Sequence, residues 1–319
     1  MKQILILYAV VFASFTSLAG TECQPLTSAS FDFSLKTTTC YQSSFHAKSV
    51  KRNIGFNVLI PRGYSTSNDP MPYAVFLHGR GGDRNHITSI DGVNILDQDI
   101  RDGGAPFLIF APNGGNHYWM NAAISKEKWG DMVTKDLIEY IEKNFHVIKN
   151  DPCKRALFGI SMGGNGVLQL ALNNPDVFCT GFAISPVFRT PKEIWTPSAP
   201  ADSDLPKEDY DSYGTGKDYE ARSARNLCEK RKKDTGTCLP YKNFRLIIGN
   251  SDPMLGETPD TRTFIEDLAK MHSEFEIGIK NCTKAEICGA HKDCNSHSAS
   301  YWKCQLPEVM TWLSAQLKK

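Results

Sequence analysis

The sequence predicts an α/β fold with a mostly parallel central sheet and helices on both faces. Short apolar runs of strand length alternate with segments whose apolar residues recur at helical spacing. Several runs are apolar throughout, which is typical of strands buried on both faces of a parallel sheet. Three of the runs end in glycine-rich or polar turns. In such sheets the reactive side chains gather at the carboxyl ends of the strands, so we expect a functional site there.

The expected elements follow from these patterns, with residues 20–50 forming edge strands. The expected strands are 54–60, 71–77, 107–111, 156–160, 178–184, 244–248 and 275–279, and the expected helices are 132–145, 166–172, 261–271 and 307–317. One region, at about 187–240, is polar and breaks the alternation. It is either a solvated surface excursion or a cap-like insertion beside the functional site, and the sequence favours neither.

Composition excludes several classes of protein. The chain has 319 residues, of which 41% are hydrophobic and 22% are charged, too apolar for a disordered chain. It contains no collagen-like, heptad or solenoid repeat. The formal net charge is +1 and no basic stripe is present, so nucleic acid is not an expected partner.

Residues 1–19 predict a secretory signal peptide. Lys2 precedes an apolar stretch from Ile4 to Phe15, and Ser17 and Ala19 supply small residues before a cleavage site. This stretch is shorter than the roughly 20 residues that a membrane span needs, so no stable membrane anchor is expected. We therefore expect a secreted or periplasmic protein in which residues 20–319 form a single domain.

The cysteines also predict export. An even number of cysteines in an exported chain favours disulfides. Zinc is the alternative, because His291 and His297 lie among the last four cysteines, but the tight Cys-x2–4-Cys pairs of structural zinc sites are absent and we expect no metal. All ten cysteines follow residue 19: Cys23, Cys40, Cys153, Cys179, Cys228, Cys238, Cys282, Cys288, Cys294 and Cys304.

Two cysteine pairs can be predicted from their positions. Cys228 and Cys238 are separated by a short loop. Cys153 and Cys179 start two successive expected strands. Neighbouring parallel strands lie about 4.8 Å apart, within the roughly 4.4–6.8 Å between Cα atoms that a disulfide allows.

The main chemical signal is Gly159-Ile160-Ser161-Met162-Gly163. It follows the expected strand ALFGI and opens the expected helix GVLQLAL, the strand–turn–helix context of a nucleophile elbow. The turn is so tight that its flanking positions must lack side chains, and the serine hydroxyl is exposed at a helix N-terminus. The alternative is a helix-capping serine between glycines that only pack.

A serine hydroxyl is a poor nucleophile, so it needs a base and a group that orients the base. In this fold the three follow one another as Ser, Asp and His. Asp252 ends an expected strand, whereas the alternatives Asp260 and Asp267 enter the following helix. His297 lies just before the last expected helix, and His291 is the alternative base.

Acyl transfer also needs two backbone N–H donors for the negative oxygen of the intermediate. We expect one from Met162, directly after the nucleophile, and one from Arg80 in the turn HGRGG, with Gly81 as the alternative. Tyr118, Trp119 and Trp302 are candidate walls of a substrate pocket, although aromatic residues more often simply pack.

These residues together resemble the putative-esterase (esterase D-like) family of α/β-hydrolases. The likeness extends from about Phe56 to Leu317 and rests on FLHGRGG, EKWGDMVTKDLIEYIEKNF, FGISMGGNGVLQLALNNPDVF, GNSDPML and HSASYW. The family includes secreted feruloyl and acetylxylan esterases. The resemblance implies the α/β-hydrolase fold, a catalytic triad of Ser161, Asp252 and His297, a small-molecule or carbohydrate ester as substrate, and no cofactor.

The family's histidine usually follows Gly-Gly, whereas Asn295-Ser296 precede His297 here. This departure bears on the shape of the site near the histidine more than on the chemistry. We expect a serine carboxylesterase that works through an acyl-enzyme. The alternatives are an acyltransferase acting on a sugar or lipid alcohol, a serine peptidase, and a binding protein that keeps an esterase-like fold without activity.

Overall fold

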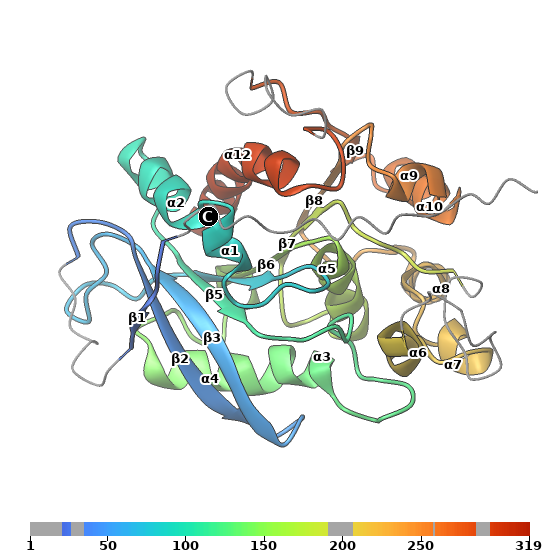
Figure 1. Cartoon of the computed structure of the whole chain (residues 1–319), viewed down its shortest axis with the longest axis horizontal. Coiled ribbons are helices and arrows are strands. Elements are labelled where there is room, and N and C mark those ends of the chain that lie inside the picture. The colour runs from blue at the N-terminus through green and yellow to red at the C-terminus, as the bar shows by residue number, and fades with distance from the viewer. Residues whose placement is uncertain (1–20, 27–34, 191–206, 258, 285–293) are drawn as a thin grey trace, which may run out of the picture.

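The computed structural model describes residues 21–26, 35–190, 207–257, 259–284 and 294–319. The predicted signal peptide, Cys288 and His291 lie outside these residues. A nine-stranded sheet forms the centre, in the order β1-β2-β3-β5-β4-β6-β7-β8-β9 (Figure 1). Its strands are β1 (Gln24–Pro25), β2 (Thr39–Ala47), β3 (Arg52–Ile60), β4 (Tyr73–Leu77), β5 (Leu108–Pro112), β6 (Arg155–Ile160), β7 (Thr180–Ile184), β8 (Asn243–Ile248) and β9 (Glu276–Ile279).

The sheet is parallel from β5 to β9, as predicted, and antiparallel where β3 pairs with β2 and with β5. Residues 20–50 supply the strands at one edge of the sheet, as expected: β1 is the edge strand, and β2 lies between β1 and β3. The parallel strands place the ends of β4, β6 and β8 at one edge of the sheet. The segments that follow them carry the predicted oxyanion turn, nucleophile and acid, respectively.

Helices cover both faces of the sheet (Figure 1). One core contains α1, α2 and α12, and the other contains the helix that runs from α3 to α4, together with α5, α8 and α10. Among the described residues no helix is both long and apolar enough to cross a bilayer. The helices are α1 (His86–Ser89), α2 (Gly92–Arg101), α3 (Trp129–Asp131), the π-helical turn η2 (Met132–Leu137), α4 (Ile138–Asn144), the 3-10 turn η3 (Pro152–Lys154), α5 (Met162–Asn173), α6 (Lys207–Tyr213), α7 (Lys217–Glu220), α8 (Ala224–Thr235), α9 (Met254–Glu257), α10 (Pro259–Met271) and α12 (Ala299–Lys318).

The apolar strands separate two cores because successive side chains point to opposite faces. In β4, Tyr73, Val75 and Leu77 lie in the core with α5, while Ala74 and Phe76 face α12. All five are fully buried. Burial of each large apolar side chain stabilises the fold by about 1.5–3 kcal/mol, so a continuous apolar run is strongly held as a central strand.

Several elements differ from those expected. The last helix begins at Ala299 rather than Pro307, because the Ser298 hydroxyl accepts a hydrogen bond from the Tyr301 N–H and caps it. Pro307 therefore lies inside the helix. The helices α1 and α2 were not expected, and the polar insertion contains α6, α7 and α8 in its described part.

The two predicted disulfides are present. The Cα atoms of Cys153 and Cys179 are 4.6 Å apart, and those of Cys228 and Cys238 are 4.5 Å apart. Two further disulfides join Cys23 to Cys40 and Cys282 to Cys304. No described cysteine is free.

We expect the double substitution Cys153→Ala/Cys179→Ala to lower the free energy of unfolding by about 3 kcal/mol, because it releases a closed loop in the unfolded chain. Urea unfolding of both proteins under non-reducing conditions measures the difference. Equal free energies of unfolding would show that this disulfide does not constrain the unfolded chain.

Candidate active site

Ser161 sits at a tight turn between β6 and α5. Its backbone has φ = 60° and ψ = −118°, a conformation that costs a residue with a side chain about 1–3 kcal/mol. A Cβ atom at Gly163 would lie 2.0 Å from the Leu77 carbonyl oxygen, and one at Gly159 would lie 2.5 Å from the Gly163 oxygen. Only glycine fits at either position. The close packing of β4, β6 and α5 thus fixes the serine at the carboxyl edge of the sheet.

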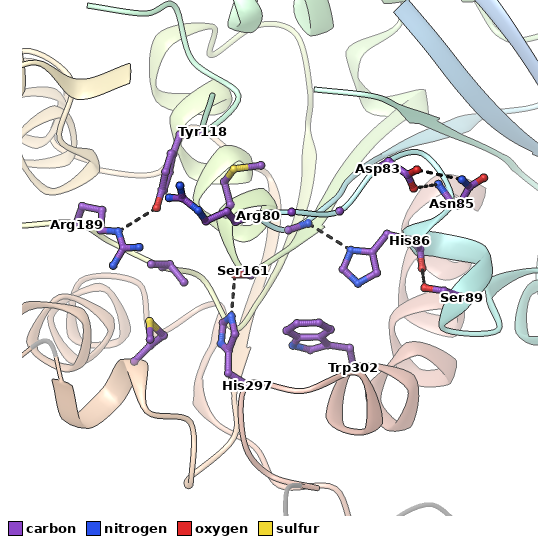
Figure 2. Close-up of a pocket in the computed structure, with 16 residues that line it drawn as sticks. Arg80, Asp83, Asn85, His86, Ser89, Tyr118, Ser161, Arg189, His297 and Trp302 are labelled. Carbon is purple, nitrogen blue, oxygen red and sulfur yellow. Dashed lines mark hydrogen bonds between the residues drawn. The ribbon is translucent and has the colours of Figure 1, made fainter. Parts of the chain in front are cut away.

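The structure brings Ser161, His297 and Asp252 together. His297 Nε2 lies 2.7 Å from Ser161 Oγ (Figure 2). His297 Nδ1 lies 2.9 Å from Asp252 Oδ2 and 3.2 Å from Oδ1. A neutral imidazole that donates its Nδ1–H to the carboxylate leaves Nε2 free to accept the serine proton. The Asp252 carboxylate is fully buried, while the His297 ring is 20% exposed.

The loops that carry the acid and the histidine touch each other. The Ser251 N–H donates to the Asn295 carbonyl oxygen at 3.1 Å, and a Cβ atom at Gly249 would lie 2.1 Å from that oxygen. The Asn295 side chain accepts a hydrogen bond from the Cys282 N–H at 2.7 Å. Asn295 therefore ties the histidine loop to the segment that follows β9 and to the loop of the acid.

The two expected N–H donors border the same space as the serine. Met162 is the first residue of α5, where a backbone N–H has no partner within the helix. Gly81, the alternative to Arg80, already donates its N–H to Asn116 Oδ1 at 2.8 Å. Among the described residues nothing accepts a hydrogen bond from the Arg80 N–H, so Arg80 is the better placed donor of the turn.

A buried histidine holds this turn in place. His78 Nε2 accepts a hydrogen bond from the Gly114 N–H at 3.0 Å, and Nδ1 donates to the Gly79 carbonyl oxygen at 2.8 Å. Burial lowers the pKa of His78, so the ring stays neutral and keeps this donor and acceptor pattern. Sequence reasoning missed this role and that of Asn116, since both depend on contacts between separate strand ends.

A cavity of about 500 Å³ opens over Ser161. Tyr118 and Arg189 line one side of it, and His86 and Trp302 line the other (Figure 2). The Trp302 ring meets the His297 ring edge to face, with centroids 5.2 Å apart. Two of the three aromatic residues expected as walls, Tyr118 and Trp302, thus lie at the cavity.

Trp119 does not line this cavity, which corrects our expectation for it. The side chain is fully buried, and its Nε1–H donates to the His78 carbonyl oxygen at 3.2 Å. Its ring fills the space beside Gly114 and Gly166, where added Cβ atoms would come within 2.4 Å and 2.8 Å of it. Trp119 therefore packs beneath the site and holds the turn from below.

The described residues contain no group of three His, Cys, Asp or Glu side chains placed to hold a metal ion. The chemistry available at the cavity is that of a hydroxyl beside an imidazole, a buried carboxylate and two backbone N–H groups. This combination suits attack on a carbonyl carbon, because it supplies a nucleophile, a base and donors for a developing oxyanion.

Known proteins resemble this chain over most of its length. Residues 47–313 match the sequence model of the family described as "Putative esterase". An esterase of Mycobacterium tuberculosis is 33% identical over 131 residues, which are 40% of this chain and 28% of that protein. The aligned part of the chain thus spans under a third of that relative. An acetyl esterase of Caldicellulosiruptor saccharolyticus is 22% identical over 86% of this chain and 97% of its own.

Solved structures show the same fold. A ferulic acid esterase superposes with a TM-score of 0.67 at 18% identity, covering 88% of this chain and 98% of the other. At this identity the likeness concerns the fold, which is that of the α/β-hydrolases, as predicted. The family match covers both the elbow and the segment that bears Asp252 and His297. By this match the chain belongs to the putative esterase family.

Proposed function

We propose that the chain is a serine carboxylesterase in which Ser161, His297 and Asp252 act as a catalytic triad. The observation that carries the proposal is the hydrogen-bonded chain from Ser161 Oγ through His297 to a fully buried carboxylate. Family membership supports ester hydrolysis as the reaction. An intact set of three groups argues against a binding protein that has lost its chemistry.

In the proposed acylation, Ser161 Oγ attacks the ester carbonyl carbon while its proton passes to His297 Nε2. The carbonyl electron pair moves to the oxygen, which accepts hydrogen bonds from the N–H groups of Arg80 and Met162. Each such donor is typically worth about 3–4 kcal/mol of barrier reduction. The intermediate then expels the alcohol, which takes the proton from His297, and an acyl-enzyme remains.

In the proposed deacylation, water gives a proton to His297 Nε2 and attacks the acyl carbon. The second intermediate uses the same N–H donors, and its collapse returns the proton to Ser161 and releases the acid. Asp252 keeps the ring oriented and stabilises the imidazolium in both halves of the reaction. Transfer of the acyl group to another alcohol follows the same steps, and analysis of products formed with added alcohols separates the two reactions.

The substrate is proposed to be a small ester, including esters of carbohydrates. A cavity of about 500 Å³ holds a compact acyl or alcohol group, and its lining combines aromatic rings with polar side chains. Relatives named acetyl esterase and ferulic acid esterase support such substrates. A panel of aryl, acetylated-xylan, feruloyl and lipid esters tests this range.

We further propose that the protein is exported. Its described disulfides support an oxidising compartment, since cytosolic thiols are kept reduced. Cleavage after Ala19 would leave one catalytic domain.

We expect Ser161→Ala to lower kcat for an aryl ester by more than about a thousandfold, because the nucleophile is removed and only the cavity and the oxyanion donors remain. The same variant should no longer be labelled by a fluorophosphonate probe, while its unfolding midpoint stays close to that of the wild type. Retention of most of the activity would refute the proposed nucleophile.

Asp252→Asn should lower kcat by about 10³–10⁴-fold, because an amide neither fixes the Nδ1–H tautomer nor stabilises the imidazolium. Asp267→Asn is the matched control: this half-exposed carboxylate pairs with Arg225 on the surface. We expect its kcat to stay within about twofold of the wild type, as for other exposed ion pairs. Equal losses in the two variants would show that Asp252 does not act through His297.

Two histidines line the cavity, and they can be told apart by pH. Burial lowers the pKa of His86 to about 4, so its ring is neutral throughout the neutral range. A general base must be deprotonated to act, and His86 is already neutral over this range, so His86 should not set the acid limb of kcat/KM. We expect His86→Gln to leave the position of that limb unchanged between pH 5 and 8. A shift of more than about 0.5 pH unit, from full rate–pH profiles, would assign the limb to His86 instead.

A further inference from the structure

The insertion at 187–240 places a buried carboxylate directly behind the cavity wall. Asp209, in the first turn of α6, is fully buried and does not itself line the cavity. Its Oδ1 accepts a hydrogen bond from Arg80 Nη1 at 2.5 Å, and its Oδ2 lies 2.8 Å from Arg189 Nε. The Tyr118 hydroxyl donates to the same Oδ2 at 3.3 Å.

The three partners of Asp209 come from three separate parts of the wall. Arg80 belongs to the turn after β4, Tyr118 to the segment after β5, and Arg189 to the segment after β7. Figure 2 shows all three residues around Ser161, with Arg189 hydrogen-bonded to Tyr118. One carboxylate therefore connects three segments that each follow a different strand.

Apart from the Arg80 side chain, the turn at 79–82 is held through its backbone, by hydrogen bonds of Gly79 with His78 and His86 and of Gly81 with Asn116. Gly79, Gly81 and Gly82 surround Arg80, and Gly81 has φ = 70°. Glycines give a backbone more conformational freedom than any other residue. Arg80 is the only residue of positions 79–82 with a side chain. Any contact that restrains this turn through one of its side chains must therefore be made by Arg80, whose own N–H has to keep its direction.

The helix that carries Asp209, α6, also contacts α5, which supplies the other N–H donor. The Asn165 side chain on α5 donates a hydrogen bond to the Tyr213 hydroxyl on α6 at 2.5 Å, and both residues are buried. α5 begins at Met162. α6 is thus joined by buried polar contacts to both sides of the proposed oxyanion hole.

We propose that Asp209 is a positioning residue, which holds the Arg80 side chain so that the Arg80 N–H stays directed at the oxyanion. This inference rests on the proposed function. It predicts that Asp209 matters more in the transition state than in substrate binding, since the N–H donor is needed most where negative charge develops. It also gives one residue of the insertion, Asp209, a role at the active site, so the insertion is more than a surface excursion.

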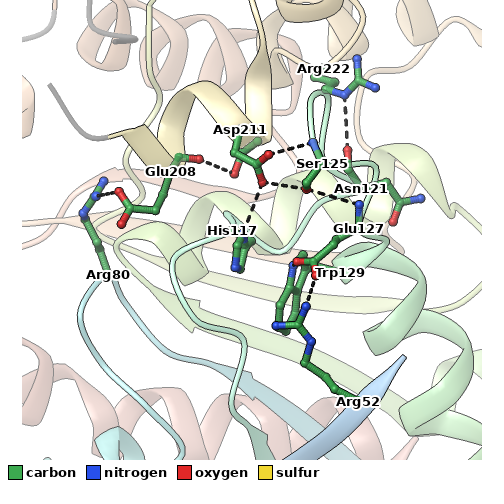
Figure 3. A network of polar contacts seen from close by, with 11 residues as sticks. Arg52, Arg80, His117, Asn121, Ser125, Glu127, Trp129, Glu208, Asp211 and Arg222 are labelled. Atoms are coloured by element: carbon green, nitrogen blue, oxygen red, sulfur yellow. Dashed lines mark hydrogen bonds and ion pairs between the residues drawn. The ribbon is translucent and has the colours of Figure 1, made fainter. Parts of the chain in front are cut away.

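The neighbouring carboxylates of α6 supply matched controls. Asp211, two residues further along α6, accepts hydrogen bonds from the Ser125 N–H at 2.8 Å and the Ser125 hydroxyl at 3.0 Å (Figure 3). It fixes the helix to another loop without touching Arg80. Glu208 does pair with Arg80, at 3.1 Å, but its carboxylate is 47% exposed and should contribute little (Figure 3).

The test compares Asp209→Asn with Asp211→Asn and Glu208→Gln in the full chain. We expect Asp209→Asn to lower kcat by about 10–100-fold with KM changed by less than about threefold, because an oxyanion donor is misdirected rather than removed. Its affinity for a trifluoromethyl ketone, whose adduct with Ser161 carries an oxyanion, should fall by a similar factor. Both controls should keep kcat and ketone affinity within about twofold.

Asp209→Asn leaves the Arg80 and Arg189 guanidinium groups with a weaker buried partner and could disturb folding. A second variant therefore breaks the same contact from the Arg80 side. Arg80→Gln keeps the backbone N–H and removes the guanidinium group that binds Asp209. We expect the same fall in kcat as in Asp209→Asn, and no further fall in the double variant, because both changes break one connection. Fluorophosphonate titration counts the folded sites in each preparation.

The outcomes separate the two proposals. Additive losses in the double variant, a change confined to KM, or unchanged ketone affinity would overturn the role of Asp209 while leaving the esterase proposal intact. Activity that survives Ser161→Ala would overturn the proposed function itself. Equal losses in kcat for Asp209→Asn and Asp211→Asn would show that α6 acts only as general structural support.

Discussion

The site depends on how closely β4, β6 and α5 approach one another. The Gly163 backbone packs directly against the Leu77 carbonyl, with no room for a side chain between them. This contact bends the chain sharply at Ser161 and holds its hydroxyl clear of the sheet. The His297 ring can then reach the hydroxyl from a loop that lies 136 residues away in sequence. If the elbow were wider, the ring could not contact both the serine and the carboxylate behind it.

The parts of the fold that could be predicted are those governed by local patterns. Continuous apolar runs identified the central strands, because a strand buried on both faces is apolar at most of its positions rather than at every second one. The starts of β6 and β7 were clear enough to predict the disulfide between Cys153 and Cys179. The helix at α2 was overlooked although Val93 and Leu96 are buried and spaced by three residues. The polar composition of the insertion gave no signal for α6, α7 and α8. These helices lack an apolar stripe, and their stability comes from tertiary contacts.

In the candidate site, too, the residues with a local sequence signal could be predicted, and those defined by tertiary contacts could not. Ser161, Asp252 and His297 could be named because each lies next to a recognisable strand end or helix start. The order of the three along the chain then restricted the choice. His78 also follows a strand end, but its role, like those of Asn116 and Asp209, depends on a partner distant in sequence. For Trp119 the sequence suggested a substrate wall, but the ring packs into the space left beside Gly114 in its own segment and Gly166 on α5. Complementarity between distant segments is invisible in one sequence without a fold to place them.

The insertion shows how a polar segment can become part of a site. A carboxylate in water interacts only weakly with an arginine, but Asp209 is fully sheltered and meets two guanidinium groups and a hydroxyl. Removing such a carboxylate from water is costly unless the partners are well placed, so the contacts specify one arrangement of the three wall segments. The glycines of the oxyanion turn let the backbone approach a substrate closely, yet they leave Arg80 as the only residue of positions 79–82 with a side chain. The Arg80 side chain, bound by Asp209 on α6, restrains the turn from outside. The glycines of the turn can then stay free of side chains on the side that faces the substrate.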